Sequence, residues 1–187
     1  MYNGIGKSKP KLNKTSIVLM GISFVLSIVY LILNAVGFFE PKIKDKAFYF
    51  DDFSIVLNDT FTESELVSCD AVFLSDDVMI CVTKEEFDGL TENCHIGMSN
   101  TAYEYANYVA NANNKTDKAI EITREIINGK EYTYFTFTTE EEKSRTNRTY
   151  SYKTDDAFWI VQFITFSEEY DSLIGTIESY ASSIEFE

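Results

Sequence analysis

The sequence predicts an α+β protein: an antiparallel sheet of about six to seven strands flanked by two helices, preceded by one N-terminal transmembrane helix. Three observations lead to this prediction. Residues 17–39 carry no charge, short apolar segments separated by turn residues follow them, and two later segments have apolar residues at helical spacing. With 15 Phe and 12 Tyr, the chain has ample apolar surface for one core.

The uncharged run is long enough to cross a membrane. As a helix its 23 residues would measure about 35 Å, against a hydrocarbon core of about 30 Å. Short basic flanks stay in the cytoplasm, and the only charges before the run are Lys7, Lys9, Lys11 and Lys14. We therefore expect a cytoplasmic basic tail (1–16), a transmembrane helix (17–39), a tether (40–47) and an extracytoplasmic domain (48–187). The membrane is then the first expected partner of this single-pass protein.

A cleaved signal peptide is the alternative. Ala35 and Gly37 place small residues at the spacing that signal peptidase prefers, so cleavage near Gly37 would release a secreted protein. The apolar stretch before Ala35 is longer than the about 7 to 15 residues of a signal-peptide core, and no cysteine follows closely enough for lipid attachment. The length therefore favours an uncleaved anchor.

The charge of the chain limits its partners. The formal net charge is −14, and the part beyond residue 39 carries −18 because the four leading lysines are excluded from it. Such a domain repels nucleic acid and anionic lipid. We expect no nucleic-acid partner.

The first strands are expected soon after the tether. In 53–58 every second residue is a large apolar one, which is typical of a strand with one buried face. The runs 71–74 and 78–82 are joined by the turn residues 75–77 and predict a hairpin. Because both runs are apolar on both faces, we expect them inside the sheet.

A helix is expected from Ser99 to about Asn113. Ser99 is a good N-cap residue, and alanines and aromatic residues follow at helical spacing. Tyr103, Tyr105 and Tyr108 cannot all face one core, so at least one should be exposed. An exposed ring is a possible recognition anchor, although tyrosines that cover a sheet edge are the more ordinary interpretation.

A second hairpin is expected after this helix. The segments 120–126 and 132–137 flank Asn128-Gly129, the dipeptide suited to a type I′ turn. Residues 140–147 are expected to form a charged loop. Beyond it, 149–153 and 157–166 predict another strand pair.

The last of these strands should be central, because it is apolar on both sides: Phe158, Ile160 and Ile164 on one, Trp159, Val161 and Phe163 on the other. Ser167 is the expected N-cap of a closing helix, with Glu168 and Glu169 in its first turn. The expected buried stripe of that helix is Tyr170, Leu173, Ile174, Ile177 and Ala181. The end of the chain, 183–186, should add an edge strand or pack as coil.

This order of elements resembles the PsbP-like α+β fold, which is shared by the photosystem II extrinsic subunit, a Ran-binding transport factor and bacterial envelope lipoproteins. The resemblance covers most of 48–187 and rests on FSIVL at 53–57, FWIVQF at 158–163 and YASSIEF at 180–186. These are core and helix-end positions, so no functional residue is carried over. The resemblance implies a domain that binds a protein or a lipidic molecule. Unlike the lipoproteins, this chain lacks a lipidation cysteine near its apolar run.

The three cysteines allow at most one internal disulfide. A hairpin centred on residues 76–77 places Cys81 opposite Val72, and Cys69 is at an odd separation from Val72. We therefore expect Cys69 and Cys81 on opposite faces and unpaired. Cys94-His95 has the residue types of a nucleophile and its base, but adjacent side chains point to opposite sides of an extended chain, so we expect no dyad.

Motifs for chemistry are missing from the sequence. His95 is the only histidine, which excludes histidine-rich metal sites, and no nucleophile-elbow, P-loop or dinucleotide glycine pattern occurs. The acidic pairs at predicted turns lack the spacing of a calcium loop and should be solvated: 51–52, 76–77, 140–142, 155–156 and 168–169. We expect no catalytic, cofactor-binding or metal-binding residue.

The predicted function is a non-catalytic, membrane-anchored extracytoplasmic domain of the cell envelope that binds a protein or another envelope component. Frequent Lys, Asn and Ile are typical of a low-GC bacterium. A carrier or sensor of a small apolar ligand held between sheet and helix is the alternative, and an enzyme with unrecognised carboxylate chemistry comes third.

Overall fold

A computed structural model describes residues 27–32, 43–87, 101–113, 119–127, 130–140 and 143–187. The chain divides into two units, 1–42 and 43–187, and each is described separately. In the first unit, residues 27–32 are helical, and the rest of the expected membrane span lies outside the described residues. Within the described part of the chain, no helix is both long and apolar enough for a membrane crossing. The anchor stays a prediction.

The second unit is α+β, as predicted, and contains ten strands and two described helices, α3 and α4. In chain order these are β1 (Asp45–Phe50), β2 (Phe53–Asn58), β3 (Thr62–Leu66), β4 (Cys69–Leu74), β5 (Met79–Glu86), α3 (Ala102–Asn113), β6 (Ile122–Ile127), β7 (Lys130–Thr139), β8 (Arg145–Lys153), β9 (Ala157–Phe166), α4 (Tyr170–Ser182) and β10 (Glu185–Phe186).

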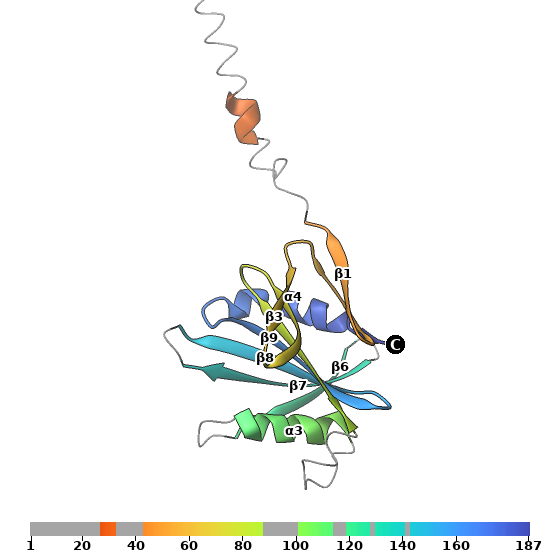
Figure 1. Ribbon diagram of the computed structural model, residues 1–187. Helices are drawn as coiled ribbons and strands as arrows, with labels where there is room; N and C mark the ends of the chain where they lie inside the picture. Colours follow the sequence, from red (N-terminus) through yellow and green to blue (C-terminus); the bar gives the residue numbers. More distant parts are fainter. Residues whose placement is uncertain (1–26, 33–42, 88–100, 114–118, 128–129, 141–142) are drawn as a thin grey trace, which may run out of the picture. The chain divides into compact units, whose positions relative to one another are not determined.

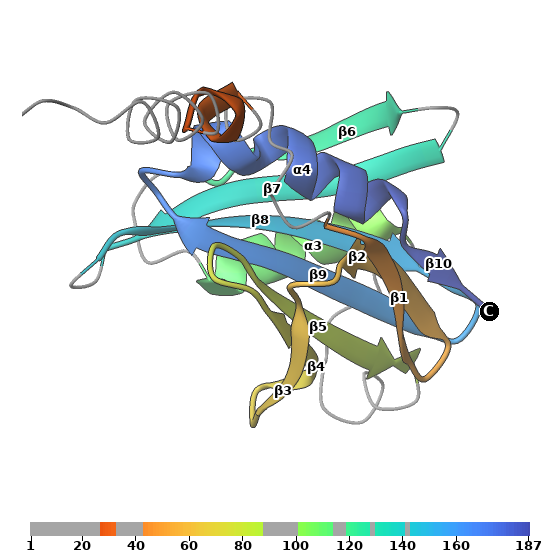
Figure 2. The ribbon, with the colours of Figure 1, turned by 90° about the horizontal axis from the view of Figure 1, so that it is seen from above.

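Seven of the strands form one antiparallel sheet in the order β3-β4-β5-β9-β8-β7-β6, and β1, β2 and β10 form a small second sheet. Helix α3 lies on one face of the large sheet and α4 on the other, as Figure 1 shows. The view in Figure 2 shows that the small sheet lies beside α4. The main core fills the space between these elements and the large sheet.

Strand β9 is central, as its sequence predicted. It pairs with β5 on one side and β8 on the other. Trp159, Val161 and Phe163 are fully buried in the main core. On the opposite face, the ring of Phe158 stacks on Tyr105 of α3 with centroids 4.4 Å apart. The two predicted faces of this strand are confirmed.

Strands β1 and β3 were not expected. β1 begins at Asp45, inside the range 40–47 that the sequence analysis assigned to a tether, because residues 45–47 pair with the end of β2. All five residues of β3 are exposed, so the strand carries no apolar alternation that a sequence pattern could reveal. It forms one edge of the large sheet and pairs only with β4.

The predicted hairpin around Asn128-Gly129 is confirmed by the pairing of Ile127 with Lys130, although the dipeptide itself lies outside the described residues. The expected charged loop is shorter than 140–147, because β8 begins at Arg145 and pairs there with both Thr139 and Phe166. The end of the chain forms the strand β10, which pairs with β2.

Both predicted helix caps are wrong. α3 begins at Ala102, and the Oγ1 of Thr101 accepts a hydrogen bond from the Glu104 backbone N–H at 3.2 Å. The expected cap, Ser99, lies outside the described residues. α4 begins at Tyr170 without a side-chain cap. Ser167 instead continues the strand pairing, because its backbone N–H donates to the Ser144 carbonyl at 3.0 Å.

The buried sides of the two helices follow the predicted pattern in part. Ile177 and Ala181 of α4 are fully buried, and Tyr170 and Leu173 pack at the margin of the core. In α3, Tyr105 is buried and Tyr108 is 38 % exposed. At least one exposed tyrosine was expected there, and this is confirmed.

Cys69 and Cys81 form a disulfide with their Cα atoms 5.8 Å apart, which contradicts the sequence prediction. Cys81 does lie opposite Val72. However, Ser64 pairs with Val72 while Leu66 pairs with Cys69, so β4 contains one residue more than β3 over this stretch. Such a bulge interrupts the alternation of side chains and lets Cys69 reach the face of Cys81.

Candidate functional site

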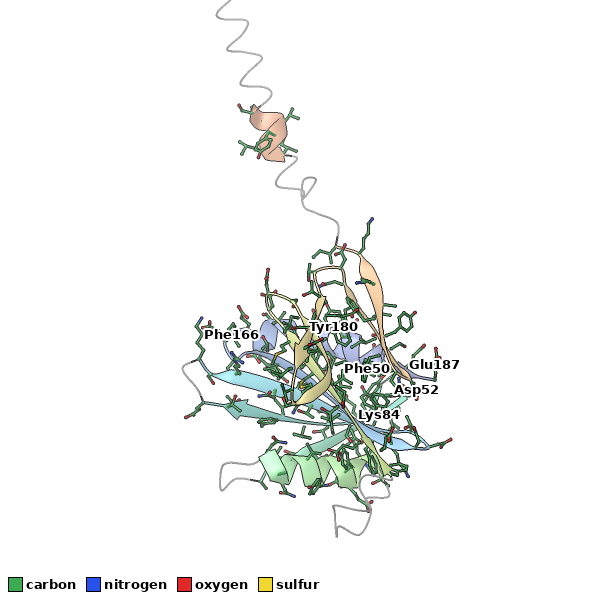
Figure 3. All side chains as sticks on the ribbon, viewed as in Figure 1. Phe50, Asp52, Lys84, Phe166, Tyr180 and Glu187 are labelled. Atoms are coloured by element: carbon green, nitrogen blue, oxygen red, sulfur yellow. A yellow bond between two sulfur atoms is a disulfide. The ribbon has the colours of Figure 1, made fainter. Side chains whose placement is uncertain are left out.

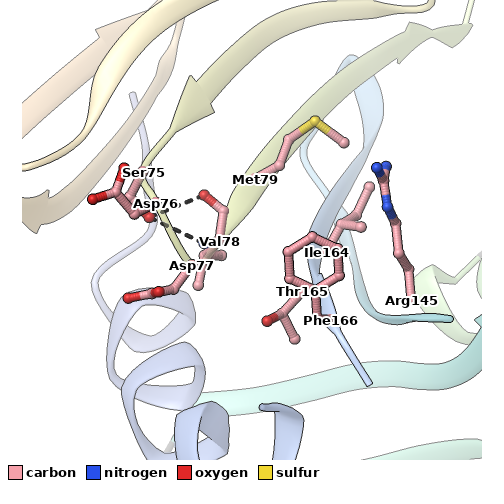
Figure 4. A pocket seen from close by; sticks show the side chains of 9 residues that line it. All are labelled: Ser75, Asp76, Asp77, Val78, Met79, Arg145, Ile164, Thr165 and Phe166. Carbon is pink, nitrogen blue, oxygen red and sulfur yellow. Dashed lines mark hydrogen bonds between the residues drawn. The ribbon is translucent and has the colours of Figure 1, made fainter. Parts of the chain in front are cut away.

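Two adjoining hollows share Phe166, the last residue of β9. Figure 4 shows the first, which has a volume of about 160 Å³ and is lined by Ser75, Asp76, Asp77, Val78, Met79, Arg145, Ile164, Thr165 and Phe166. The second has a volume of about 430 Å³ and is lined by Lys143, Ser144, Phe166, Ser167 and Glu168. We call the two hollows together the Phe166 site.

The order of strands brings these residues together. β9 lies between β5 and β8, so Ile164 pairs with Met79 and Phe166 pairs with Arg145. Directly paired residues project from the same face of a sheet. Met79, Ile164 and Phe166 are each half-buried and form the apolar floor of the first hollow.

The turn between β4 and β5 forms one wall of the first hollow. It is closed by Ser75, whose backbone N–H and Oγ donate to the Val78 carbonyl at 3.0 and 3.1 Å, while its Oγ accepts from the Val78 N–H at 3.1 Å. These bonds hold the exposed Asp76 and Asp77 at the rim. Figure 4 shows them on the opposite side of the hollow from Arg145.

The charged groups of the Phe166 site do not pair with each other. The Arg145 guanidinium lies 5.9 Å from the centroid of the Phe166 ring, and the Lys143 ammonium lies 5.0 Å from it. Among the described residues, no carboxylate lies within 4.0 Å of either cation, and no cation within that distance of Asp76 or Asp77. The first hollow thus has an apolar floor, with the acidic turn of Asp76 and Asp77 on one side and Arg145 on the other.

Thr165 carries an unpartnered hydroxyl next to the Phe166 site. Its side chain is nearly fully buried and lines the first hollow, and its Oγ1 has no hydrogen-bond partner among the described residues. Leaving a buried hydroxyl unpaired costs about 1 to 3 kcal/mol. The side chain of Thr165 points to the opposite face of β9 from Ile164 and Phe166, so this hydroxyl belongs to the buried side of the sheet.

A different charge cluster occupies the other end of β5. The Lys84 Nζ lies 2.6 Å from the Oδ2 of Asp51, 3.4 Å from that of Asp52 and 3.7 Å from that of Asp156. It also lies 5.1 Å from the centroid of the Trp159 ring. The hydrogen bond to Asp51 is the main cause that raises the pKa of Lys84.

The Lys84 cluster joins two acidic pairs that the sequence analysis treated as separate solvated turns. It ties the β1–β2 and β8–β9 turns to β5, and Asp51 adopts a positive φ of 48° in the first of these turns. Among the described residues, no group of three or more acidic, cysteine or histidine side chains has an arrangement suited to a metal ion. The cluster is structural, because its cation is already paired.

A second buried cation, Arg148 of β8, fastens α4 to the sheet. Its guanidinium donates to Glu178 Oε1 at 3.1 Å, to the Tyr150 hydroxyl at 3.3 Å and to the Tyr170 hydroxyl at 3.4 Å, and lies 3.7 Å from the centroid of the Tyr134 ring. Burial raises the pKa of Tyr150 to about 12. These groups keep their ordinary charge at neutral pH.

Lys130 is the one described residue whose pKa moves toward neutrality, because burial lowers it. Its ammonium donates to the Ile184 carbonyl at 2.6 Å and so serves the end of α4. The other shifts all move away from neutrality: the pKa of Lys84, Arg148 and five tyrosines is raised, and that of Asp156 is lowered. Catalytic acids and bases need the opposite direction.

The sequence analysis did not single out the Phe166 site. It recognised 75–77 as a turn, but it placed Lys143 and Arg145 in a loop and treated Phe166 as the end of a strand. Of the residues it did consider, Cys94 and His95 lie outside the described residues. The only feature of the sequence that could have indicated the Phe166 site is the pair of basic residues, Lys143 and Arg145, close to a strand end in an acidic chain.

The comparisons with known proteins bear on the fold. No protein family model matches the sequence, and a search of curated proteins finds no similar sequence. The solution structure of cyanobacterial PsbP (CyanoP) from Synechocystis sp. PCC 6803 is similar, with a TM-score of 0.51 and 12 % identity over 78 % of this chain and 92 % of that one. The chain therefore has a PsbP-like fold, as its sequence patterns predicted.

Two further structures are similar to a lesser degree. A protein of Bacteroides thetaiotaomicron VPI-5482 matches with a TM-score of 0.49 and 14 % identity, over 76 % of this chain and 48 % of that one. LpqN, involved in cell envelope biogenesis of Mycobacterium tuberculosis, matches with a TM-score of 0.43 and 10 % identity, over 78 % and 91 %. At such identities a shared fold carries no statement about function.

Proposed function

We propose that this protein is a single-pass membrane protein whose PsbP-like domain lies outside the cytoplasm and acts by binding, without catalysis. Three separate supports stand behind the proposal: the predicted span 17–39 with its lysine flank, the Cys69–Cys81 disulfide, and the direction of the pKa shifts. The partner is a protein or another component of the cell envelope.

The disulfide is the observation that carries the location. Disulfides persist in oxidising compartments and are rare in the cytosol, where thiols are kept reduced. Cys69 and Cys81 are linked across neighbouring elements of one sheet. The disulfide therefore supports a domain outside the cytoplasm. The lysine flank predicts the same location for a different physical reason.

The charge states support a binding rather than a catalytic role. In the described residues, Lys84 and Arg148 are paired with carboxylates and their pKa is raised, and burial raises the pKa of Tyr150, so these groups keep their ordinary charge states. Lys130 is the exception, because burial lowers its pKa. The Phe166 site differs, because it exposes charges of both signs around an apolar floor. Such a surface can hold a ligand by charge and contact.

The geometry favours binding at the surface over a carrier that holds its ligand between sheet and helix. The space between α4 and the large sheet is filled by the main core, which contains Trp159, Phe163 and Tyr150 as nearly or fully buried side chains. Both described hollows lie at the end of the sheet instead.

Thiol labelling in intact cells tests the location. In a Cys94→Ser variant of the full chain, only the disulfide cysteines remain. We expect a membrane-impermeant maleimide to label them only after an impermeant reductant is added. A cytoplasmic domain would show the reverse: no labelling of intact cells with either treatment, and labelling after lysis without reductant. A variant without cysteines gives the background.

The mass of the protein recovered from membranes tests the anchor. An uncleaved span gives the full 187 residues in an alkali-resistant membrane fraction. A secreted product that starts near Gly37 would refute the anchor while leaving the external location intact.

A further inference from the structure

We propose that the outer face of the small sheet, formed by Ala47, Tyr49 and Val56, lies on the lipid surface of the membrane that holds the anchor. This inference rests on the proposed anchor and adds a second contact of the protein with the membrane, through the headgroup region. Three features support it: the apolar residues on this face, the short chain that joins it to the predicted span, and the charge of that chain.

The small sheet has large apolar residues on both faces. Its inner face belongs to the main core, where Phe48 and Ile55 are buried. Ala47 pairs directly with Val56, so both project from the outer face, and Tyr49 lies on the same side two residues further along β1. The side chain of Tyr49 is 70 % exposed and that of Val56 is 39 % exposed. A sheet face that meets only water is usually polar, so this face is suited to another contact.

The chain that joins the outer face to the predicted span is short. The span is expected to end at residue 39, and β1 begins at Asp45, so only residues 40–44 lie between them. The chain from residue 39 to Asp45 reaches at most about 20 Å when fully extended. A surface tied so closely to a bilayer meets it at a high effective concentration, so a contact too weak to recruit a free domain can hold a tethered one. A small apolar patch is therefore enough.

The residue types suit the headgroup region. The Tyr49 ring combines an apolar body with a hydroxyl, and tyrosine is enriched where membranes meet water. In the acidic part of the chain beyond the span, the segment 40–46 is an exception, because its three lysines outnumber its two acidic residues. Lysine ammonium groups are attracted to the phosphates of lipid headgroups. Asp45 and Glu185 project from the same face as Tyr49 and limit the apolar contact at its margins.

Spin labels on the full chain in phosphatidylcholine nanodiscs test the contact. In the Cys94→Ser background one label is placed by Ala47→Cys and a matched one by Ala112→Cys, an exposed alanine of α3 on the opposite face of the large sheet (Figure 1). Power saturation compares accessibility to oxygen, which concentrates in lipid, with accessibility to a water-soluble nickel complex. We expect the ratio of oxygen to nickel accessibility to be several-fold higher at residue 47. Equal ratios at the two positions overturn the proposal.

Matched double variants test whether the apolar side chains make the contact. Tyr49→Thr/Val56→Thr removes the apolar surface but keeps residues that favour strands, so the fold should be retained. We expect it to lower the accessibility ratio at residue 47 to the value at residue 112. Leu66→Thr/Val67→Thr, which changes two exposed apolar residues elsewhere in the domain, should leave the ratio at residue 47 unchanged. A high ratio that survives Tyr49→Thr/Val56→Thr overturns the proposal, because the short chain alone would then explain it.

The same measurements separate this contact from a contact between two copies and from failure of the anchor. A protein interface would shield the label at residue 47 from both oxygen and nickel and bring two labels close enough for dipolar broadening, and that result overturns the lipid contact. A chain that does not enter the nanodiscs refutes the anchor, and this contact with it. A chain that enters them with a water-exposed label at residue 47 refutes this contact alone and leaves the proposed anchor standing.

Discussion

Charged side chains are paired at one end of the central strands and unpaired at the other. At one end, Lys84 is almost buried and lies within 4.0 Å of three aspartates. At the other end, Arg145 lies across a hollow from Asp76 and Asp77, and among the described residues none of the three has an ion-pair partner. Figure 3 labels Lys84 and Phe166, which mark the two ends. The same residue types thus form a cluster of ion pairs around Lys84, which we call the closed end, and an unpaired surface at the Phe166 site, which we call the open end.

The closed end has further fastenings. The backbone N–H of Lys84 donates to Asp70 Oδ2 at 2.8 Å, and the disulfide of Cys69 lies next to Asp70 in the chain. The C-terminal residue also joins this end, since the Glu187 N–H donates to the Asp52 carbonyl at 2.9 Å. The comparison teaches that stability should depend on the closed end and binding on the open end.

Removing the disulfide should have the largest effect on stability. Cys69 and Cys81 close a short loop, and the loss of such a link lowers the free energy of unfolding by about 2 to 3 kcal/mol. We expect this loss in Cys69→Ser/Cys81→Ser, measured by urea unfolding of the full chain in micelles. The fluorescence of Trp159, the only tryptophan, reports on the core. Cys94→Ser is the matched control, and an equal effect of both variants would contradict the prediction.

Replacing Lys84 should have the next largest effect. In Lys84→Met, three aspartates would face each other without their cation. The carboxylates are about half exposed, so solvent moderates the loss, and we expect the variant to unfold at a lower temperature but to be more stable than the disulfide variant. The raised pKa of Lys84 means that this contribution is present below pH 10.5 and is lost at higher pH.

Lys143→Met is the control for this variant, because Lys143 is exposed and lies at the open end. Thermal unfolding of both variants at pH 7 should separate them. If Lys143→Met lowers the unfolding temperature as much as Lys84→Met does, the contrast between the two ends is wrong.

The loss of stability at acidic pH should depend on Asp156. The Thr154 hydroxyl donates to its Oδ1 at 2.7 Å and is the main cause that lowers the pKa of Asp156, with Lys84 as a further cause. Because the pKa is lower in the folded state, this contribution is present above pH 4 and is lost as the pH falls through the folded value. Thr154→Val should raise the pKa of Asp156 and so reduce the loss of stability at acidic pH. A carboxyl-carbon NMR titration measures the pKa of Asp156 in both proteins. An unchanged midpoint for Asp156 would exclude the hydroxyl as the cause.

Replacing Arg145 should have the smallest effect on stability. The residue is exposed and has no ion pair among the described residues, so Arg145→Gln should change the free energy of unfolding by no more than about 0.5 kcal/mol. Urea unfolding in the same micelles measures this. A loss as large as that of Lys84→Met would show that Arg145 is a structural residue, and the open end would then be no different from the closed one.

Much of the fold could be predicted from local patterns. Apolar residues on both faces of 157–166 indicated the central strand, because only a strand covered on both sides can bury them all. Asn128-Gly129 indicated its hairpin because few dipeptides adopt the required turn. Strand β3 left no such pattern, since an edge strand pairs through its backbone and its side chains face water.

The disulfide and the caps could not be read from spacing alone. A bulge between Cys69 and Val72 changes the face of one residue, and nothing local in the sequence announces it. Ser167 had the composition of a cap, but the strand pairing of β8 with β9 continued through it. In each case a contact with a distant segment overrode a local preference.

The sequence by itself determined the fold class, the acidic character beyond residue 39 and the expectation of a membrane anchor, because hydrophobic period, charge and apolar length are local properties of a chain. Only the tertiary structure decided which charges pair and which stay open. Residues 75–79, 143–145 and 164–168 are far apart in the chain, and the order β5-β9-β8 alone brings them together at Phe166. Strand pairing is a long-range choice made by the whole core, so the site it creates leaves no continuous motif.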